Sequence, residues 1–274
     1  MALHPLQHLA LIALSFAGVA AHAAETRIPT QDGIVYGTAD GQPLTMDYYA
    51  PRGAGMHPIA IIIHGGGYHG GDSKNGSEAY VADFLAPAGY AVFSVNYRVA
   101  PQYPYPYMVY DVQRAVRYIR YHARDWSADP GKIALVGGSA GGYLSNMVGL
   151  LNAPGDPHAA DPVDRVSAKA QAVVSLYAQS SFEFVPLNAD VHRFLDPFIA
   201  QKGEKEAIRE ASPITYVSRS SAPRMNTSPC WKRPTCKPRC MRFACAATSS
   251  PSPAASMAPA AGTSCPTCRT GSAR

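Results

Sequence analysis

The sequence predicts an α/β fold built on a doubly wound, mostly parallel sheet. Four runs rich in isoleucine, valine and alanine lack polar alternation, which is typical of parallel strands buried on both faces. Helix-like stretches lie between and after these runs, and this alternation favours right-handed parallel connections. At 274 residues the chain is long enough for one such domain. The expected strands are Ile59–Ile63, Ala91–Val95, Ile133–Val136 and Ala172–Leu176, and the expected helices are Ser77–Ala86, Tyr107–Ala123, Ala140–Leu151 and Glu204–Glu210.

The helix expected at Tyr107–Ala123 shows the clearest periodicity of apolar residues. Its apolar residues recur at positions 112, 115, 116 and 119, the spacing of one helix face. We therefore expect that face to pack on the sheet.

The run Val136–Gly142 places Ser139 between an expected strand and an expected helix. The G-x-S-x-G pattern in this context is typical of a sharp turn that exposes the serine Oγ as a nucleophile. Small neighbours fit because so tight a turn leaves little room for side chains. A glycine-rich loop can produce the pattern by chance, but the flanking strand and helix favour a hydrolase with Ser139 as its catalytic residue.

A second glycine turn, His64-Gly65-Gly66-Gly67, follows the first expected strand. Such a turn presents backbone N–H groups to a developing negative charge. We therefore expect an oxyanion hole made by the amides of Gly65, Gly66 and Ala140, with His64 orienting the loop. A phosphate-binding loop is the alternative, but the spacings that it requires are absent here.

Further motifs follow in the same order: Asn96–Pro101, Pro106 with Asp111, Asp129–Ile133 and Ala211–Ile214. Together with the two glycine turns they resemble an α/β-hydrolase of the alpha/beta-hydrolase-3, or hormone-sensitive-lipase-like, esterase group, close to the BD-FAE-like carboxylesterases. The resemblance covers roughly residues 35–223. It implies hydrolysis of small carboxylic esters, often short acyl, acetyl or feruloyl esters, without a metal or organic cofactor. An amidase such as an arylformamidase, a peptidase, or a non-catalytic binding protein on the same fold stays open.

The N-terminus predicts export. An apolar run from Leu9 to Ala21 is followed by Ala21-His22-Ala23, an A-x-A cleavage pattern. The run is too short to span a membrane and is typical of a secretory signal. We expect residues 1–23 to be removed, no stable membrane anchor, and a location in the periplasm or outside the cell. A buried N-terminal helix is the alternative.

Residues 224–274 differ in composition from the body of the chain. They contain all six cysteines, seven prolines and eight of the 24 basic residues, but no Leu, Ile, Val, Asp, Glu or His. The preceding residues therefore carry 16 basic against 19 acidic groups and no cysteine. The cysteine spacing fits no metal site with a complete ligand set. The charges are spread too thinly to predict nucleic-acid binding.

A frameshift accounts for this composition. When the third base of each codon is read with the first two bases of the next, Met225-Asn226 must give Glu, and Cys230-Trp231 must give Leu. The shifted frame permits an amphipathic helix, then an aspartate and a Gly-His pair in the order that the resemblance implies for a triad. We therefore predict a hydrolase core at 24–223 that lacks its last strand or strands and helix, and an aberrant, disordered tail at 224–274.

No Asp or His follows Pro223, so the proton-handling partners of Ser139 have no matching positions. His158 and His192, with Asp190 and Asp196 nearby, are poor substitutes, and His69 could edge the pocket. Arg98 and Asp111 are expected to fix a loop to the neighbouring helix. Tyr103, Tyr105 and Tyr107 either line a substrate pocket or pack a proline-rich loop. The sequence thus predicts a serine esterase that is nearly inactive in this form.

Overall fold

The computed structural model describes residues 28–74, 78–183 and 187–219. One six-stranded sheet has the order β1-β2-β4-β3-β5-β6. The pairs β3–β4, β3–β5 and β5–β6 are parallel, whereas β1–β2 and β2–β4 are antiparallel. The predicted α/β class with a mostly parallel sheet is therefore confirmed. The strands are β1 (Gln31–Ala39), β2 (Gln42–Tyr49), β3 (His57–Ile63), β4 (Ala91–Val95), β5 (Ala128–Gly138) and β6 (Ala172–Leu176).

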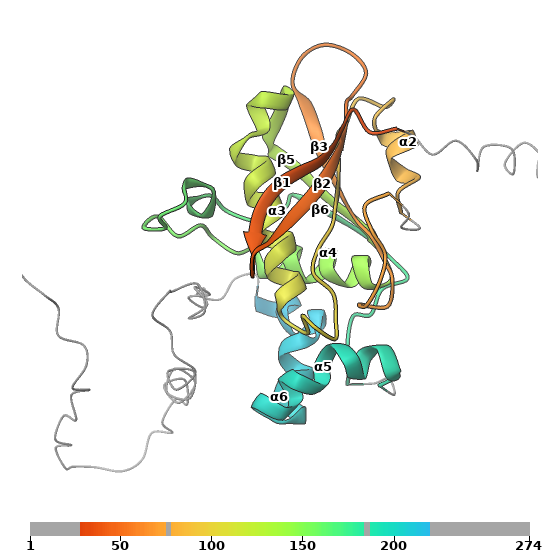
Figure 1. Cartoon of the computed structure of the whole chain (residues 1–274), viewed down its shortest axis with the longest axis vertical. Coiled ribbons are helices and arrows are strands. Elements are labelled where there is room, and N and C mark those ends of the chain that lie inside the picture. Colours follow the sequence, from red (N-terminus) through yellow and green to blue (C-terminus); the bar gives the residue numbers. More distant parts are fainter. Residues whose placement is uncertain (1–27, 75–77, 184–186, 220–274) are drawn as a thin grey trace, which may run out of the picture. The chain divides into compact units, whose positions relative to one another are not determined.

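Helices cover both faces of the sheet (Figure 1). Ile59, Ile61 and Ile63 of β3 join a large core cluster with the helices α3 and α4. Ala60 and Ile62, which point the other way, pack with α2. β3 is thus buried on both faces, as its unbroken apolar sequence predicts. The helical elements are α2 (Val81–Leu85), α3 (Tyr107–Tyr121), η1 (Ala123–Trp126), α4 (Ala140–Leu151), η2 (Pro162–Arg165), α5 (Ala189–Lys202), α6 (Glu204–Ala211) and η3 (Pro213–Arg219).

Several elements differ from the sequence prediction. The β1–β2 hairpin was not predicted because polar residues interrupt both strands; β1 is mostly exposed, whereas β2 is buried from Met46 to Tyr49. Its turn, Asp40-Gly41, has φ values of 50° and 75°, which suit a two-residue hairpin loop. Helix α5 was also missed, since Pro197 lies inside it and obscures the helical signal. The helix expected at Ser77–Ala86 is shorter and begins at Val81.

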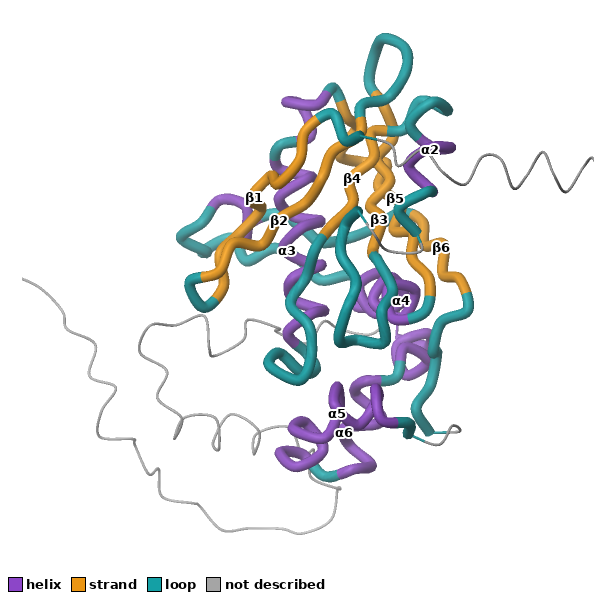
Figure 2. Tube along the Cα trace, turned by 45° about the vertical axis from the view of Figure 1, so that its right-hand side comes forward, coloured by secondary structure: helices purple, strands orange, loops and turns teal. Residues whose placement is uncertain are grey.

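The position of β6 corrects a further expectation. Figure 2 shows β3 and β4 in the middle of the sheet, with β1 and β6 on opposite sides. Among the described residues β6 is the last strand of the order, so Val173 and Val174 are exposed and not buried on both faces. A groove of about 450 Å³ runs beside it between α4 and η3, where Ile214 and Val217 are exposed. The predicted loss of a strand and helix concerns residues outside those described.

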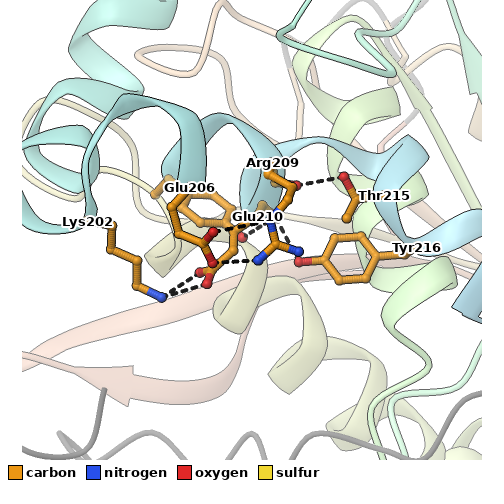
Figure 3. Close-up of polar contacts among 7 residues, drawn as sticks. Lys202, Glu206, Arg209, Glu210, Thr215 and Tyr216 are labelled. Atoms are coloured by element: carbon orange, nitrogen blue, oxygen red, sulfur yellow. Dashed lines mark hydrogen bonds and ion pairs between the residues drawn. The ribbon is translucent and has the colours of Figure 1, made fainter. Parts of the chain in front are cut away.

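The last described helices are tied to each other and to the core by hydrogen bonds (Figure 3). Lys202 of α5 binds both carboxylate oxygens of Glu210 at 2.7 Å. The Tyr216 hydroxyl donates to the Glu210 carbonyl at 2.8 Å. Tyr143 of α4 donates to the Ala211 carbonyl at 2.8 Å. These bonds fix α5, α6 and η3 beside α4.

The described part of the chain contains neither a membrane-spanning helix nor a cluster of metal ligands. None of its helices is both long and apolar enough to cross a membrane. It also contains no group of three or more His, Cys, Asp or Glu side chains that could hold a metal ion. The predicted signal segment at 1–23 and the tail at 224–274 lie outside the described residues.

Candidate active site

Ser139 is the single residue between β5 and α4. Its backbone has φ 52° and ψ −121°, a conformation that residues other than glycine rarely adopt. The side chain is exposed, although the residues on both sides of it are buried. Its amide donates to the Leu176 carbonyl at the end of β6, at 3.0 Å, which fixes the turn. The predicted sharp strand–turn–helix geometry is therefore present.

Close backbone packing explains the glycines around this serine. A Cβ on Gly141 would lie 2.0 Å from the carbonyl oxygen of Ile63 and 2.6 Å from that of His64. A Cβ on Gly137 would lie 2.4 Å from the carbonyl carbon of Gly141. Only glycine lets the first turn of α4 approach the ends of both β3 and β5 this closely.

The structure brings the two predicted glycine turns together. A Cβ on Gly65 would lie 3.1 Å from the carbonyl oxygen of Gly138, the residue before Ser139. Gly66 has φ 128° and is exposed. The amides of Gly66 and Ala140 have no acceptor among the described residues. No other described group therefore engages either amide.

The Gly65 amide differs from its predicted role. It is buried and donates to a carboxylate oxygen of Glu78 at 2.8 Å. A donor already bound to a carboxylate is not available to a substrate oxygen. Glu78 itself is only 1% exposed and was not singled out in the sequence. No periodic pattern or motif of the sequence marks it.

His64 supports the glycine turn. It is buried, its Nδ1 lies 2.7 Å from the Gly65 carbonyl, and its ring stacks on Tyr97 at 4.3 Å between centroids. Burial lowers the pKa of His64, although the Gly65 carbonyl and nearby carboxylates oppose this shift. The imidazole is therefore neutral and shielded from solvent, a setting that suits a structural role in the turn.

Arg98 and Asp111 also have a structural role. The guanidinium and backbone amide of Arg98 donate to Asp111 at distances between 2.8 and 3.1 Å, joining the loop after β4 to α3. The rings of Tyr103 and Tyr107 lie 4.7 and 5.1 Å from the guanidinium carbon. Tyr105 is buried, and its hydroxyl donates to the Glu210 carbonyl. Of the two interpretations left open for these tyrosines, the packing role fits these contacts.

Among the described residues, no hydrogen bond joins Ser139 to the candidate proton acceptors. His192 and Asp196 pair with each other at 2.9 Å on α5, and both are exposed. His158 lies in the loop after α4. His69 binds Asp190 at 3.1 Å at the rim of the glycine turn. Within the described residues, the hydroxyl of Ser139 has no hydrogen bond to a histidine.

Comparison with known proteins identifies the family. The family model described as BD-FAE matches residues 46–226, about two thirds of the chain. This chain belongs to the BD-FAE family. The resemblance expected from its motifs is thus confirmed, and the fold is that of the α/β-hydrolases.

Curated relatives of this family member are described as ester hydrolases. A probable carboxylic ester hydrolase of Mycobacterium tuberculosis, LipM, is 30% identical over 176 residues, which are 62% of this chain and 40% of LipM. Esterase LipC of the same organism is 32% identical over 173 residues, 61% of this chain and 42% of LipC. This chain therefore spans about two fifths of the length of these relatives.

Solved structures give the same picture. An acetyl ester-xyloside bifunctional hydrolase from Caldicellulosiruptor lactoaceticus is 26% identical, with a TM-score of 0.60, over 70% of this chain and 72% of that one. A truncated carbohydrate esterase from gut microbiota is 25% identical, with a TM-score of 0.58, over 71% and 74% of the two chains. More than a quarter of each of these structures has no counterpart in the matched region.

Proposed function

We propose that this protein descends from a serine carboxylesterase and acts on small carboxylic esters through Ser139. The observation that carries the proposal is the exposed Ser139 hydroxyl, held on a strained turn beside the free amides of Gly66 and Ala140. The relatives named above as ester hydrolases support the same reaction class.

In this reaction the Ser139 Oγ attacks the ester carbonyl and its proton passes to a base. The carbonyl oxygen becomes an oxyanion, which accepts hydrogen bonds from the amides of Gly66 and Ala140. Collapse of the intermediate expels the alcohol, which takes up a proton, and leaves an acyl group on Ser139. Water then attacks this acyl-enzyme and releases the acid.

Proton transfer is the weak point of this 274-residue chain. The described histidines are engaged elsewhere or remote, and residues 224–274 contain no Asp or His. Loss of the base in serine hydrolases costs on the order of 10⁴- to 10⁶-fold in turnover. We therefore propose that this chain keeps its nucleophile and oxyanion donors but turns over slowly.

Hydrolysis of p-nitrophenyl acetate tests the slow turnover. The purified 274-residue chain should give no rate above that of the Ser139→Ala variant. Clear Ser139-dependent turnover would show that some residue of this chain still serves as the base.

A fluorophosphonate probe tests the nucleophile separately. The Oγ–P bond forms as the P–F bond breaks, fluoride leaves, and the hydroxyl proton goes to solvent. Mass spectrometry should find slow labelling at Ser139 and none at this position in Ser139→Ala. Labelling only at other residues would refute the assignment of Ser139.

We propose further that a frameshift near codons 221–225 replaced the original C-terminal part, and that residues 1–23 direct export. The abrupt change in composition supports the first statement, and the A-x-A site after an apolar run supports the second. Sequencing the encoding DNA in related strains tests the frameshift, because an intact frame with these same codons would contradict it. N-terminal sequencing of protein from the periplasm or medium tests the signal, because a mature chain that retains Leu9 would contradict it.

A further inference from the structure

The buried carboxylate of Glu78 contacts three segments of the candidate site at once. One oxygen accepts the Gly65 amide of the turn after β3, at 2.8 Å. The other accepts the hydroxyl of Tyr177, the residue after β6, at 3.1 Å. A Cβ on Gly138 would lie 2.3 Å from that same oxygen and 2.5 Å from the Tyr177 hydroxyl. Glu78 and Tyr177 thus fill the space beside the end of β5, one residue before the nucleophile.

Ser139 depends on the same three segments. Its amide is held by the Leu176 carbonyl, directly before Tyr177, and Gly138, the residue before it, lies against Gly65 of the glycine turn. Gly138 leaves room for the carboxylate, because any side chain there would collide with it. The carboxylate therefore links the oxyanion turn, the nucleophile turn and the end of β6.

The hydrogen bond to Glu78 also decides which amides of the glycine turn remain available. It holds the buried Gly65 amide, so the exposed Gly66 amide is the first in the turn without an acceptor among the described residues. A hydrogen bond from an amide to a buried carboxylate is short and strong. Rotation of the Gly65 peptide would break it, so the direction of the next peptide is restrained as well.

We propose that Glu78, together with Tyr177, is the positioning residue of the oxyanion hole, and that it acts by holding Gly65 so that Gly66 and Ala140 meet the oxyanion. This inference rests on the proposed function of Ser139. Glu78 touches the backbone of the turn and not the substrate, so it is not itself catalytic.

The negative charge of Glu78 and its positioning of the glycine turn should affect the reaction in opposite directions. A negative carboxylate close to a developing oxyanion raises the energy of the transition state. Any benefit from Glu78 must therefore come from geometry. Glutamine keeps an oxygen for the Gly65 amide and offers an N–H to the Tyr177 hydroxyl, so Glu78→Gln preserves the geometry and removes the charge. Alanine removes both.

The experiment measures phosphonylation of Ser139 in the full 274-residue chain by a fluorophosphonate, and separates the maximal rate, kinact, from the half-saturating concentration, KI. In Glu78→Ala, kinact should fall about 10- to 100-fold with KI unchanged, because misplaced donors weaken transition-state binding. Glu78→Gln should stay within about threefold of the parent chain, since its donors keep their positions. In Tyr177→Phe, kinact should fall by about threefold, since one of the two anchors is lost.

Asp47→Ala is the matched control for lost stability. Asp47 is 2% exposed and, like Glu78, accepts a backbone amide, from Gly33, and a hydroxyl, from Ser73. Asp47→Ala should lower the melting temperature without lowering kinact. If Asp47→Ala lowers kinact as much as Glu78→Ala does, or if Glu78→Gln behaves like Glu78→Ala, the positioning role is refuted.

Failure of the proposed function gives a different result. If Ser139→Ala is labelled as fast as the parent chain, the nucleophile assignment fails, whatever Glu78 does. The proton resonance of the Gly65 amide reports on Glu78 without any reaction. It should lie downfield in the parent chain and move upfield in Glu78→Ala, and an unchanged position would refute the hydrogen bond.

Discussion

Replacing Ser139 with glycine should stabilise the protein while removing its proposed nucleophile. Ser139 has φ 52° and ψ −121°, close to the first central position of a type II′ turn, where glycine is preferred. Its side chain is exposed and makes no capping hydrogen bond to α4. The serine side chain therefore contributes backbone strain and little packing.

The expected gain follows from two opposing terms. Backbone strain of this kind costs about 1–3 kcal/mol, and glycine relieves it. Glycine also increases the conformational entropy of the unfolded chain, which costs about 0.4–1 kcal/mol. Ser139→Gly should therefore be more stable than Ser139→Ala by about 1 kcal/mol, or about 2–4 °C in melting temperature for a domain of this size. Alanine is the correct reference because it keeps the strained Cβ and loses only the hydroxyl.

Urea denaturation followed by circular dichroism measures the difference. Ser127 provides a control, since it is also exposed and has φ 50° and ψ 38°, an ordinary left-handed conformation. Ser127→Gly compared with Ser127→Ala should show a smaller gain than the pair at position 139. The reasoning fails if Ser139→Gly is no more stable than Ser139→Ala.

Three further predictions concern the surroundings of this turn. Gly141→Ala should destabilise the fold by about 3 kcal/mol or more in urea denaturation, because its Cβ would meet two backbone carbonyls. Gly70→Ala should change stability little, because its Cβ would make one ordinary contact, 3.8 Å from the Gly66 carbonyl oxygen. Arg98→Met should lower the free energy of unfolding by about 3–5 kcal/mol in the same assay, because it leaves the carboxylate of Asp111 buried without its main partner. If Arg98→Lys is as stable as the parent chain, the bidentate geometry is contradicted. Burial lowers the pKa of His64, so His64 binds a proton more readily in the unfolded chain than in the folded one. The free energy of unfolding should therefore be highest above pH ~6.5 and fall as the pH drops below that value. The dependence of the unfolding free energy on pH should be weaker in His64→Gln.

The sequence was most informative where one physical requirement dominates. The strands expected at Ala91–Val95 and Ala172–Leu176 have the observed bounds, as does the helix Ala140–Leu151. The apolar face predicted for α3 is buried. In these elements burial in the sheet or on one helix face dictates where apolar residues occur, so the structure can be inferred from the pattern of apolar residues.

Prediction failed where elements depend on tertiary context. Polar residues interrupt both strands of the β1–β2 hairpin, and β1 is mostly exposed at the end of the described sheet, so the hairpin lacks the long apolar run of a strand buried on both faces. β6 has the sequence of a buried strand, but among the described residues no strand covers its outer edge. Burial of a strand is a property of its neighbours, which a local pattern does not contain.

The candidate site shows the same division. Ser139 and the glycine turn were predicted because tight turns demand glycine at fixed positions. Glu78 was missed because its role depends on a contact with Gly65, thirteen residues earlier, and with Tyr177, far later in the chain. The proposed set of oxyanion donors, Gly66 and Ala140, depends on that contact.

The described groups that hold Ser139 and its proposed donors lie between His64 and Tyr177, so the frameshift that we propose after Pro223 would remove proton transfer without moving Ser139. A base supplied from solvent should therefore restore part of the reaction, since Ser139 is exposed. With imidazole in the buffer, the parent chain should hydrolyse the ester at least about twice as fast as Ser139→Ala does under the same conditions. An attached base would give a far larger increase, because it acts at a high effective concentration. Because imidazole itself cleaves activated esters, the difference between the two proteins is the quantity to measure. If imidazole accelerates both equally, the hydroxyl of Ser139 is not poised for attack, and the proposed frameshift would have removed more than a base.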